Sequence, residues 1–303
     1  MPEALDFADV DGVIQRVRLE LYRENIDGAL ALLESAEVAY PDPRYHLEAD
    51  GVRRRLAHLA SREAYVQAQE RQYRGLRGRL SPKYLEKQFR MLIGRKTKKL
   101  VERRARHPEF QLLEREILAA RPVRVLDGGA GEGGVALAVA ARHPEIRVEG
   151  VDASATNVRM ARALSRFRNV GFRQGLVEEV HRLFEPASFD LVYSFAVLEH
   201  VRDVAATLAS VFTVLRPGGR FCFVVPMVDF AANGPLPPYT PLHGYCDHVR
   251  AFTERELRER FGHFEGFVLE KVHGGEKPEK IPPFLVPIEL GSFFVAVTTP
   301  GRP

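Results

Sequence analysis

Apolar residues recur at helical spacing through most of the first 115 residues. One run precedes a break at Pro41 and Pro43, and a second run follows it. The residues at this spacing are Val13, Ile14, Val17, Leu21, Ala29, Leu32, Leu33 and Ala36 before the break, and Leu47, Val52, Leu56 and Leu59 after it. Such a period is typical of helices with one buried face, so we expect residues 1–115 to form an α-helical extension.

Part of this extension resembles a tetratricopeptide repeat. Between Ile26 and Pro41, the small residues Ala29 and Ala36 and the closing proline match the second helix of that repeat. One repeat length further along the chain, the pattern is lost. Because stable arrays need about three or more repeats to bury a core, we expect a single tetratricopeptide-like helix pair packed on the following domain. A peptide-binding array is the alternative.

From residue 122 onward, short apolar runs alternate with helical patterns. The strand-like runs are Arg124–Leu126, Arg147–Val151, Val170–Gln174, Asp190–Phe195 and Arg220–Val225. The helical runs between them are Gly134–Arg142, Asn157–Arg166, Val177–Leu183 and Val204–Leu215. Strict alternation of strand and helix implies a parallel sheet with helices on both faces. We therefore expect residues 116–303 to form an α/β domain with a doubly wound sheet.

The last part of the chain departs from this alternation. Phe267–Val272 and Ser292–Thr298 are both strand-like, and prolines between them indicate a loop. Two consecutive strands joined by a loop predict an antiparallel hairpin at one edge of the sheet. The LRPGG segment, residues 215–219, is expected to form a turn before the fifth strand.

Charge is unevenly distributed along the chain. The 303 residues carry a net charge of +4, but residues 71–106 alone contain 14 Lys and Arg against two acids. We expect basic helices there, which either attract an anionic partner or present a solvated face. Nucleic acid is not the expected partner, because no recognised RNA-binding module accompanies the charge.

Composition indicates a folded protein of the cytoplasm. Apolar residues make up 45% and charged residues 28% of the chain, which is ordinary for globular proteins. No stretch approaches the roughly 18 apolar residues of a membrane span, and the first residues lack the apolar core of a secretory signal. Two cysteines, Cys222 and Cys246, form no metal-binding or disulfide framework.

The most informative segment joins the first two strands of the sheet. The first strand ends at Asp127, and Gly129, Gly131 and Gly133 follow before a helix. Asp152 ends the second strand, where a carboxylate can accept the hydroxyls of a ribose. Gly129, Gly131 and Gly134 also satisfy the dinucleotide pattern GxGxxG. Asp127 argues against that ligand, because a carboxylate repels a pyrophosphate and attracts a ligand with sulfonium and ammonium groups.

Four motifs carry a resemblance to a known family. VLDGGAGEG, EGVDAS, FDLVYSFAVLEHV and LRPGGRFCFVV, in this order and spacing, resemble the class I S-adenosylmethionine-dependent methyltransferases, close to the small-molecule subgroup. The resemblance covers about residues 122–300. It implies a Rossmann-like, mostly parallel sheet of seven strands whose last strand is antiparallel. The implied cofactor is S-adenosyl-L-methionine, with S-adenosyl-L-homocysteine as its product.

The resemblance also implies which residues bind the cofactor. Asp152 would hold the ribose, and Ala153 would lie beside the adenine. The residues expected around the methionine part are Asp127, Gly129, Ala130, Gly131, Ser194, Phe195 and Ala196, and Gly133 is a further expected cofactor-binding residue. After the third strand, the family has an aspartate for the adenine amino group, but this chain reads Gly175-Leu176-Val177. Leu176 cannot accept a hydrogen bond through its side chain, so we expect backbone groups of Leu176 and Val177, or the nearby Glu178, to serve.

Candidate catalytic residues are fewer. His200, in the exit from the fourth strand, is a candidate general base because an unperturbed imidazole has a pKa near 6.5. His248 and Arg250 lie in the long proline-rich loop after the fifth strand, and they are weaker candidates for facing the acceptor. Since the sulfonium is already an activated donor, no metal is expected.

These observations leave several functions open. The leading one is methyl transfer to oxygen or nitrogen, with carbon as a further option, of a small-molecule or glycan-type acceptor. That acceptor would be anionic if the basic segment attracts it. The alternatives are an RNA or protein methyltransferase that uses the basic segment, an NAD(P)-dependent dehydrogenase, and a non-catalytic helical adaptor.

Overall fold

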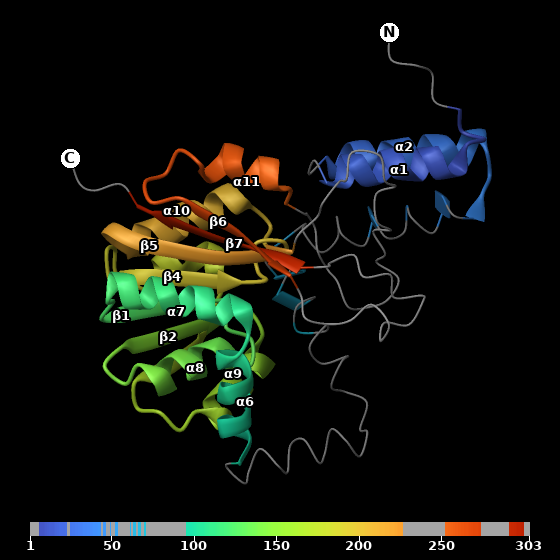
Figure 1. Ribbon diagram of the computed structural model, residues 1–303. Helices are drawn as coiled ribbons and strands as arrows, with labels where there is room; N and C mark the ends of the chain where they lie inside the picture. Colours follow the sequence, from blue (N-terminus) through green and yellow to red (C-terminus); the bar gives the residue numbers. More distant parts are fainter. Residues whose placement is uncertain are drawn as a thin grey trace.

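Seven strands form one sheet in the order β3-β2-β1-β4-β5-β7-β6 (Figure 1). The computed structural model describes residues 6–22, 25–43, 95–226, 252–273 and 291–299, with separate positions between 45 and 70. The strands are β1 (Arg124–Gly128), β2 (Arg147–Asp152), β3 (Val170–Gln174), β4 (Phe189–Phe195), β5 (Leu215–Pro226), β6 (Val268–His273) and β7 (Gly291–Thr298). β1 to β5 are parallel, and β7 runs antiparallel between β5 and β6. The seven-stranded doubly wound sheet and its terminal hairpin are thus confirmed.

Helices cover both faces of the sheet (Figure 1). On one face lie α7 (Pro108–Ala120), α8 (Gly134–Arg142) and α9 (Ala155–Leu164). On the other lie α10 (Val204–Val214), α11 (Glu254–Phe261) and the 3-10 helix η1 (Val177–Arg182). Of the helices that the structure describes, none is both long and apolar enough to cross a membrane.

Strand residues alternate between the two cores, as a period of two requires. In β5, Phe221 and Phe223 face the core under α10 and α11, whereas Cys222 and Val224 face the core under α7 and α8. All four side chains are buried. Burial on both faces explains why the strand reads as a continuous apolar run.

The LRPGG segment differs from the expected turn. β5 begins at Leu215, which pairs with Phe189, and the register then shifts before Leu191 pairs with Arg220. Within the segment, Gly218 has a φ of 75°, a conformation that glycine adopts at little cost. The segment is therefore an irregular start of β5, in which Leu215 pairs with Phe189 and the register of β4 gives residues 216–219 no partner.

The N-terminal helices have a core of their own. α1 (Val10–Tyr22) and α2 (Ile26–Ala39) pack against each other, and Ala29 and Ala36 are fully buried there. Asn25 caps α2 by accepting a hydrogen bond from the Gly28 amide. No further repeat of this pair is described in the structure, so the tetratricopeptide resemblance stays a prediction.

Two more helices of the expected extension join the sheet domain. Leu100 and Val101 of α6 (Arg95–Ala105) pack on the same core as α7 and α8. The expected domain boundary at residues 115–116 falls within α7, and it stays a prediction. Residues 71–94, which include most of the basic segment, lie outside the described residues.

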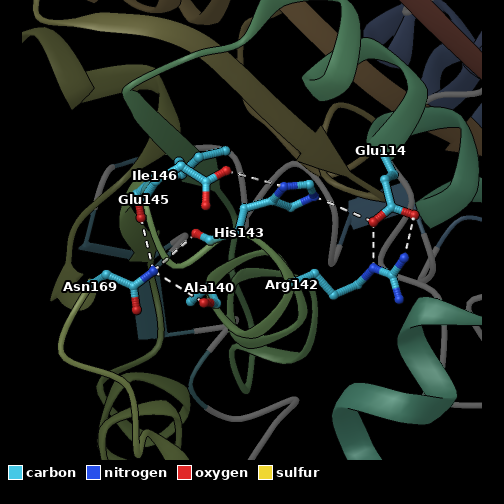
Figure 2. A network of polar contacts seen from close by, with 7 residues as sticks. All are labelled: Glu114, Ala140, Arg142, His143, Glu145, Ile146 and Asn169. Atoms are coloured by element: carbon cyan, nitrogen blue, oxygen red, sulfur yellow. Dashed lines mark hydrogen bonds and ion pairs between the residues drawn. The ribbon is translucent and has the colours of Figure 1, made fainter.

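A polar network closes the C-terminal end of α8 (Figure 2). The Asn169 amide donates to the carbonyls of Ala140, His143 and Ile146 at 3.1, 3.3 and 2.9 Å. Glu114 of α7 pairs with Arg142, and with the His143 imidazole at 3.3 Å. These contacts satisfy carbonyls that a helix end leaves without partners. They anchor α8 at the edge of the sheet where β2 begins, away from the strand ends that carry the glycine loop.

Candidate functional site

The candidate site lies where the strand order reverses, between β1 and β4. Chain segments leaving these two strands diverge, which opens a crevice at the carboxyl edge of the sheet. The pocket there holds about 460 Å³ of empty space, part of it open to solvent. Its lining consists of Gly129, Val151, Asp152, Ala153, Gly175, Leu176, Val177, Ala196, Val197 and His200.

The glycine loop after β1 is held by backbone hydrogen bonds. The amides of Gly129 and Ala130 both donate to the Val151 carbonyl at 2.8 Å. Gly129, Gly131 and Gly133 have φ values of 88°, 54° and 80°, which lie in the left-handed region. Gly133 is the N-cap of α8 and has no side chain to accept the first amides of the helix. The loop therefore presents backbone at the N-terminus of α8, where a helix favours negative charge.

Asp152 joins the loops that follow β1 and β2. Its Oδ2 accepts from the Gly131 amide at 2.8 Å. Its Oδ1 accepts from the Ser154 amide at 2.9 Å and from the Asn157 side chain at 3.0 Å. The carboxylate is only 8% exposed and lines the pocket. These hydrogen bonds hold the Asp152 carboxylate, the group expected to bind the ribose, in one orientation. They also connect it to the glycine loop.

Asp127 lies beneath the glycine loop in the centre of the sheet. Tyr193 donates a hydrogen bond of 3.0 Å to its Oδ2, and the Ala136 amide also donates to the carboxylate. Burial raises the pKa of Asp127 to about 7, against the opposing effects of Tyr193 and Arg104. A carboxyl group with this pKa changes charge near neutral pH and responds to any cation that binds nearby.

The exit from β4 contributes to the pocket through Ala196 and Val197. Ala196 has a φ of 54°, which is strained for a residue other than glycine. The Ser194 hydroxyl instead donates to the Gly128 carbonyl at 2.7 Å, and Phe195 packs edge-on to Tyr193 and Phe294. Of Ser194, Phe195 and Ala196, only Ala196 is among the residues that line the described pocket.

The segment after β3 presents apolar side chains to the pocket. Leu176 and Val177 are 3% and 7% exposed and belong to its lining. Glu178, the carboxylate considered for the adenine, is turned toward another loop. Its Oε1 accepts from the Arg202 amide at 2.6 Å and from the Asp203 amide at 3.4 Å. Partial burial raises the pKa of Glu178.

Of the three catalytic candidates, only His200 is among the residues that the structure describes. His200 is half-buried and lines the pocket beside Asp152 and Val197. His248 and Arg250 lie outside the described residues. Within the part of the chain that the structure describes, no group of three His, Cys, Asp or Glu side chains is placed to hold a metal ion.

Arg104 of α6 lies beside the start of α8, and the sequence analysis did not single it out. Its Nε lies so close to the first residue of α8 that a Cβ on Gly134 would be 3.2 Å away. That Nε is buried and has no hydrogen-bond partner among the described residues. A cation beside a helix N-terminus places two positive features together. The Arg104 side chain therefore packs against the start of α8, and its charge lowers the pKa of Asp127 against the effect of burial.

Glu70 is a second residue that the sequence analysis missed. Its carboxylate accepts hydrogen bonds from the hydroxyls of Ser154 and Thr156 at 2.7 and 2.5 Å. The Thr156 amide lies 3.4 Å from the same carboxylate. These donors belong to the first turn of α9, directly after Asp152 and Ala153. Because the partners are more than 80 residues apart, no local pattern indicated the contact.

Comparison with known proteins identifies a family and several relatives that this chain resembles. Residues 69–272 match the family described as a methyltransferase domain. A probable S-adenosylmethionine-dependent methyltransferase of Mycolicibacterium smegmatis is 34% identical over 162 residues, 50% of this chain and 60% of that protein. A ubiquinone biosynthesis O-methyltransferase of Methylocella silvestris is 34% identical over 120 residues, 38% of this chain and 45% of that protein. The match thus spans less than two thirds of either relative.

Solved structures include similar folds. The YcgJ protein of Bacillus subtilis is 20% identical, with a TM-score of 0.45 over 64% of this chain and 99% of that one. The family match covers more than half of the chain, from residue 69 to residue 272. The chain therefore belongs to the methyltransferase domain family.

Proposed function

We propose that this protein transfers a methyl group from S-adenosylmethionine to an oxygen or nitrogen of a small-molecule or glycan-type acceptor. The main observation behind the proposal is that Asp152 joins the loop after β1 to the loop after β2. One loop brings backbone amides to the α8 N-terminus, and the other brings a carboxylate to the pocket. Family membership supports the same reaction.

The described residues fit the chemical groups of this cofactor. Asp152 would accept the ribose hydroxyls, while Ala153, Leu176 and Val177 would enclose the adenine through apolar contacts and backbone groups. The guanidinium of Arg104, which packs beside the α8 N-terminus, would pair with the methionine carboxylate. In its ionised form, Asp127 would favour the ammonium and sulfonium groups through its negative charge. When bound, S-adenosylmethionine supplies a methyl group already activated by the sulfonium.

The chain's own residues would contribute alignment and proton transfer. Holding the methyl donor and the acceptor atom in line lowers the activation free energy of methyl transfer, because their orientation is fixed before the reaction. His200 lines the pocket and would take the proton from a hydroxyl acceptor. An amine acceptor that is already neutral would need this base less. The O-methyltransferase of Methylocella silvestris supports an oxygen acceptor.

An anionic acceptor is part of the proposal, and the described part of the basic segment, α6, lies beside α9. Thr97 donates to the Leu164 carbonyl at 2.8 Å, at the last residue of α9. Asp152 precedes the first residue of α9, so the first turn of α6 lies near the far end of that helix. Arg104, near the other end of α6, lies against Gly134, the first residue of α8.

The alternative functions predict different results in tests of cofactor binding and of the methyl acceptor. The family match favours methyl transfer over dehydrogenase activity, and RNA or protein remains the second class of acceptor. Thermal shift with S-adenosylhomocysteine against NADH tests the cofactor. Incubation with methyl-labelled S-adenosylmethionine and a cell extract, separated into metabolites, RNA and protein, tests the acceptor. We expect stabilisation by S-adenosylhomocysteine and label in the metabolite fraction. Stabilisation by NADH alone would overturn the proposal.

A further inference from the structure

We propose that Glu70 is a positioning residue for the cofactor site, acting through the first turn of α9 on Asp152. Glu70 belongs to the helical segment that precedes the sheet domain, and it does not line the pocket. The inference rests on the proposed function, because it takes Asp152 to be a cofactor ligand.

The Glu70 carboxylate lies within hydrogen-bonding distance of three donors at the start of α9. The Ser154 and Thr156 hydroxyls donate at 2.7 and 2.5 Å, and the Thr156 amide lies at 3.4 Å. Thr156 is the second residue of α9, where a helix leaves amides without intrahelical partners. A negative charge at this end of a helix is favourable. Glu70 therefore has both a hydrogen-bonding and an electrostatic reason to hold this turn.

The same turn orients Asp152. Ser154 is fully buried, and its hydroxyl, which donates to Glu70, accepts from the Asn157 amide at 3.2 Å. The Ser154 amide and the Asn157 side chain both donate to Oδ1 of Asp152. Glu70 thus fixes the rotamer of Ser154, whose hydroxyl caps the first turn of α9. Asp152 in turn holds Gly131 at 2.8 Å, so the chain of contacts ends at the glycine loop.

This arrangement links cofactor affinity to the N-terminal segment. A ligand that needs Asp152 in one orientation binds more tightly when Glu70 has already ordered the turn. Loss of Glu70 should leave the backbone of the pocket in place but let the side chains of Asp152 and Ser154 sample other rotamers. The effect should therefore appear in affinity for adenosine-containing ligands.

The test is calorimetric titration of the full chain with S-adenosylhomocysteine. Glu70→Gln should weaken binding about tenfold, the scale of a lost charge-assisted hydrogen bond. Glu63→Gln is the matched control, since Glu63 is an exposed carboxylate in the same segment. It should leave the affinity unchanged.

A double-mutant cycle separates positioning from general destabilisation. Thr156→Val removes one donor to Glu70, so Glu70→Gln should weaken binding less in that background than in the wild type. A lower melting temperature of the unliganded Glu70→Gln protein with wild-type affinity would assign Glu70 a merely structural role and overturn the inference. Equal effects of Glu70→Gln in both backgrounds would also overturn it.

Failure of the underlying function would look different. If wild-type protein does not bind S-adenosylhomocysteine, or Asp152→Ala binds it equally well, the proposed cofactor site is wrong. If wild-type protein binds, Asp152→Ala weakens binding and Glu70→Gln matches Glu63→Gln, the cofactor site stands and the role of Glu70 does not.

Discussion

Tyr193 of β4 and Asp127 of β1 are register partners in the centre of the sheet, and the phenol donates to Oδ2 of the carboxyl group at 3.0 Å. Both side chains are buried, and burial raises the pKa of each group. The carboxyl group of Asp127 titrates at about 7, beneath the loop that would hold a cationic ligand. A buried acid in this position makes folding and binding depend on pH.

Asp127 should make the protein less stable as pH rises. An unfolded aspartate has a pKa near 3.9, whereas the folded value is about 7. Between these values the native state holds a proton that the unfolded chain has lost, so the free energy of unfolding falls with pH by at most roughly 1.4 kcal/mol per unit. Urea unfolding at pH 5 and pH 8 should show this slope in the wild type. The slope should be smaller in Asp127→Asn, and identical slopes would show that Asp127 does not titrate in this window.

Asp152→Ala should weaken S-adenosylhomocysteine binding by about 1–3 kcal/mol, because ribose hydroxyls lose a charged acceptor. Calorimetry on the folded variant measures the loss. Asp190→Ala is the matched control. Asp190 also accepts two backbone amides, those of Val123 and Arg124, but at the opposite edge of the sheet. It should lower stability and leave affinity unchanged, and unchanged affinity in Asp152→Ala would remove Asp152 from the site.

Arg104→Ala should lower affinity only for ligands that carry the amino-acid group. Its guanidinium would pair with the methionine carboxylate, and such a bond is worth about 1.5–3 kcal/mol. Titration with S-adenosylhomocysteine should show this loss, whereas titration with 5′-methylthioadenosine, which lacks that group, should not. Arg103→Ala is the control, since Arg103 is an exposed neighbour on α6. Equal losses for both ligands would indicate that Arg104 only supports the fold.

His200→Ala should lower turnover about 10²- to 10⁴-fold with a hydroxyl acceptor, the usual range for a lost proton transfer. Affinity for S-adenosylhomocysteine should change little if the imidazole faces the acceptor. Once the acceptor is identified by label transfer, single-turnover rates and calorimetry separate the two effects. Unimpaired turnover would make His200 a lining residue with no part in proton transfer.

Gly129→Ala and Gly131→Ala should differ in stability although both glycines have positive φ. A Cβ at Gly131 meets nothing within 4 Å, so its cost should be the left-handed strain of about 1–2 kcal/mol. A Cβ at Gly129 would lie 2.2 Å from Val197 Cγ2, which should add roughly 1–3 kcal/mol of overpacking. Chemical denaturation of the two variants checks the difference. Equal costs would mean that Val197 moves aside freely.

Much of the fold follows from local patterns. The order of strands and helices from β1 to β7 agrees with the sequence, because hydrophobic period and glycine conformation depend on neighbours along the chain. Asp127 and Asp152 were also found this way, since a parallel sheet brings the ends of adjacent strands together. The LRPGG segment lies inside β5 and not before it, because Leu215 already pairs with Phe189 of β4 before the register shifts.

The sequence by itself determined the α/β architecture, the glycine loop and the carboxylates at two strand ends, because each has a signature in residues that are close along the chain. Only the tertiary structure decided that Ser194 bonds to Gly128, that Arg104 reaches the start of α8 and that Glu70 holds the first turn of α9. It also decided the pKa of Asp127, which burial raises. These features depend on which distant side chains packing brings into contact and on how much water it removes, and no periodicity along one chain records either quantity.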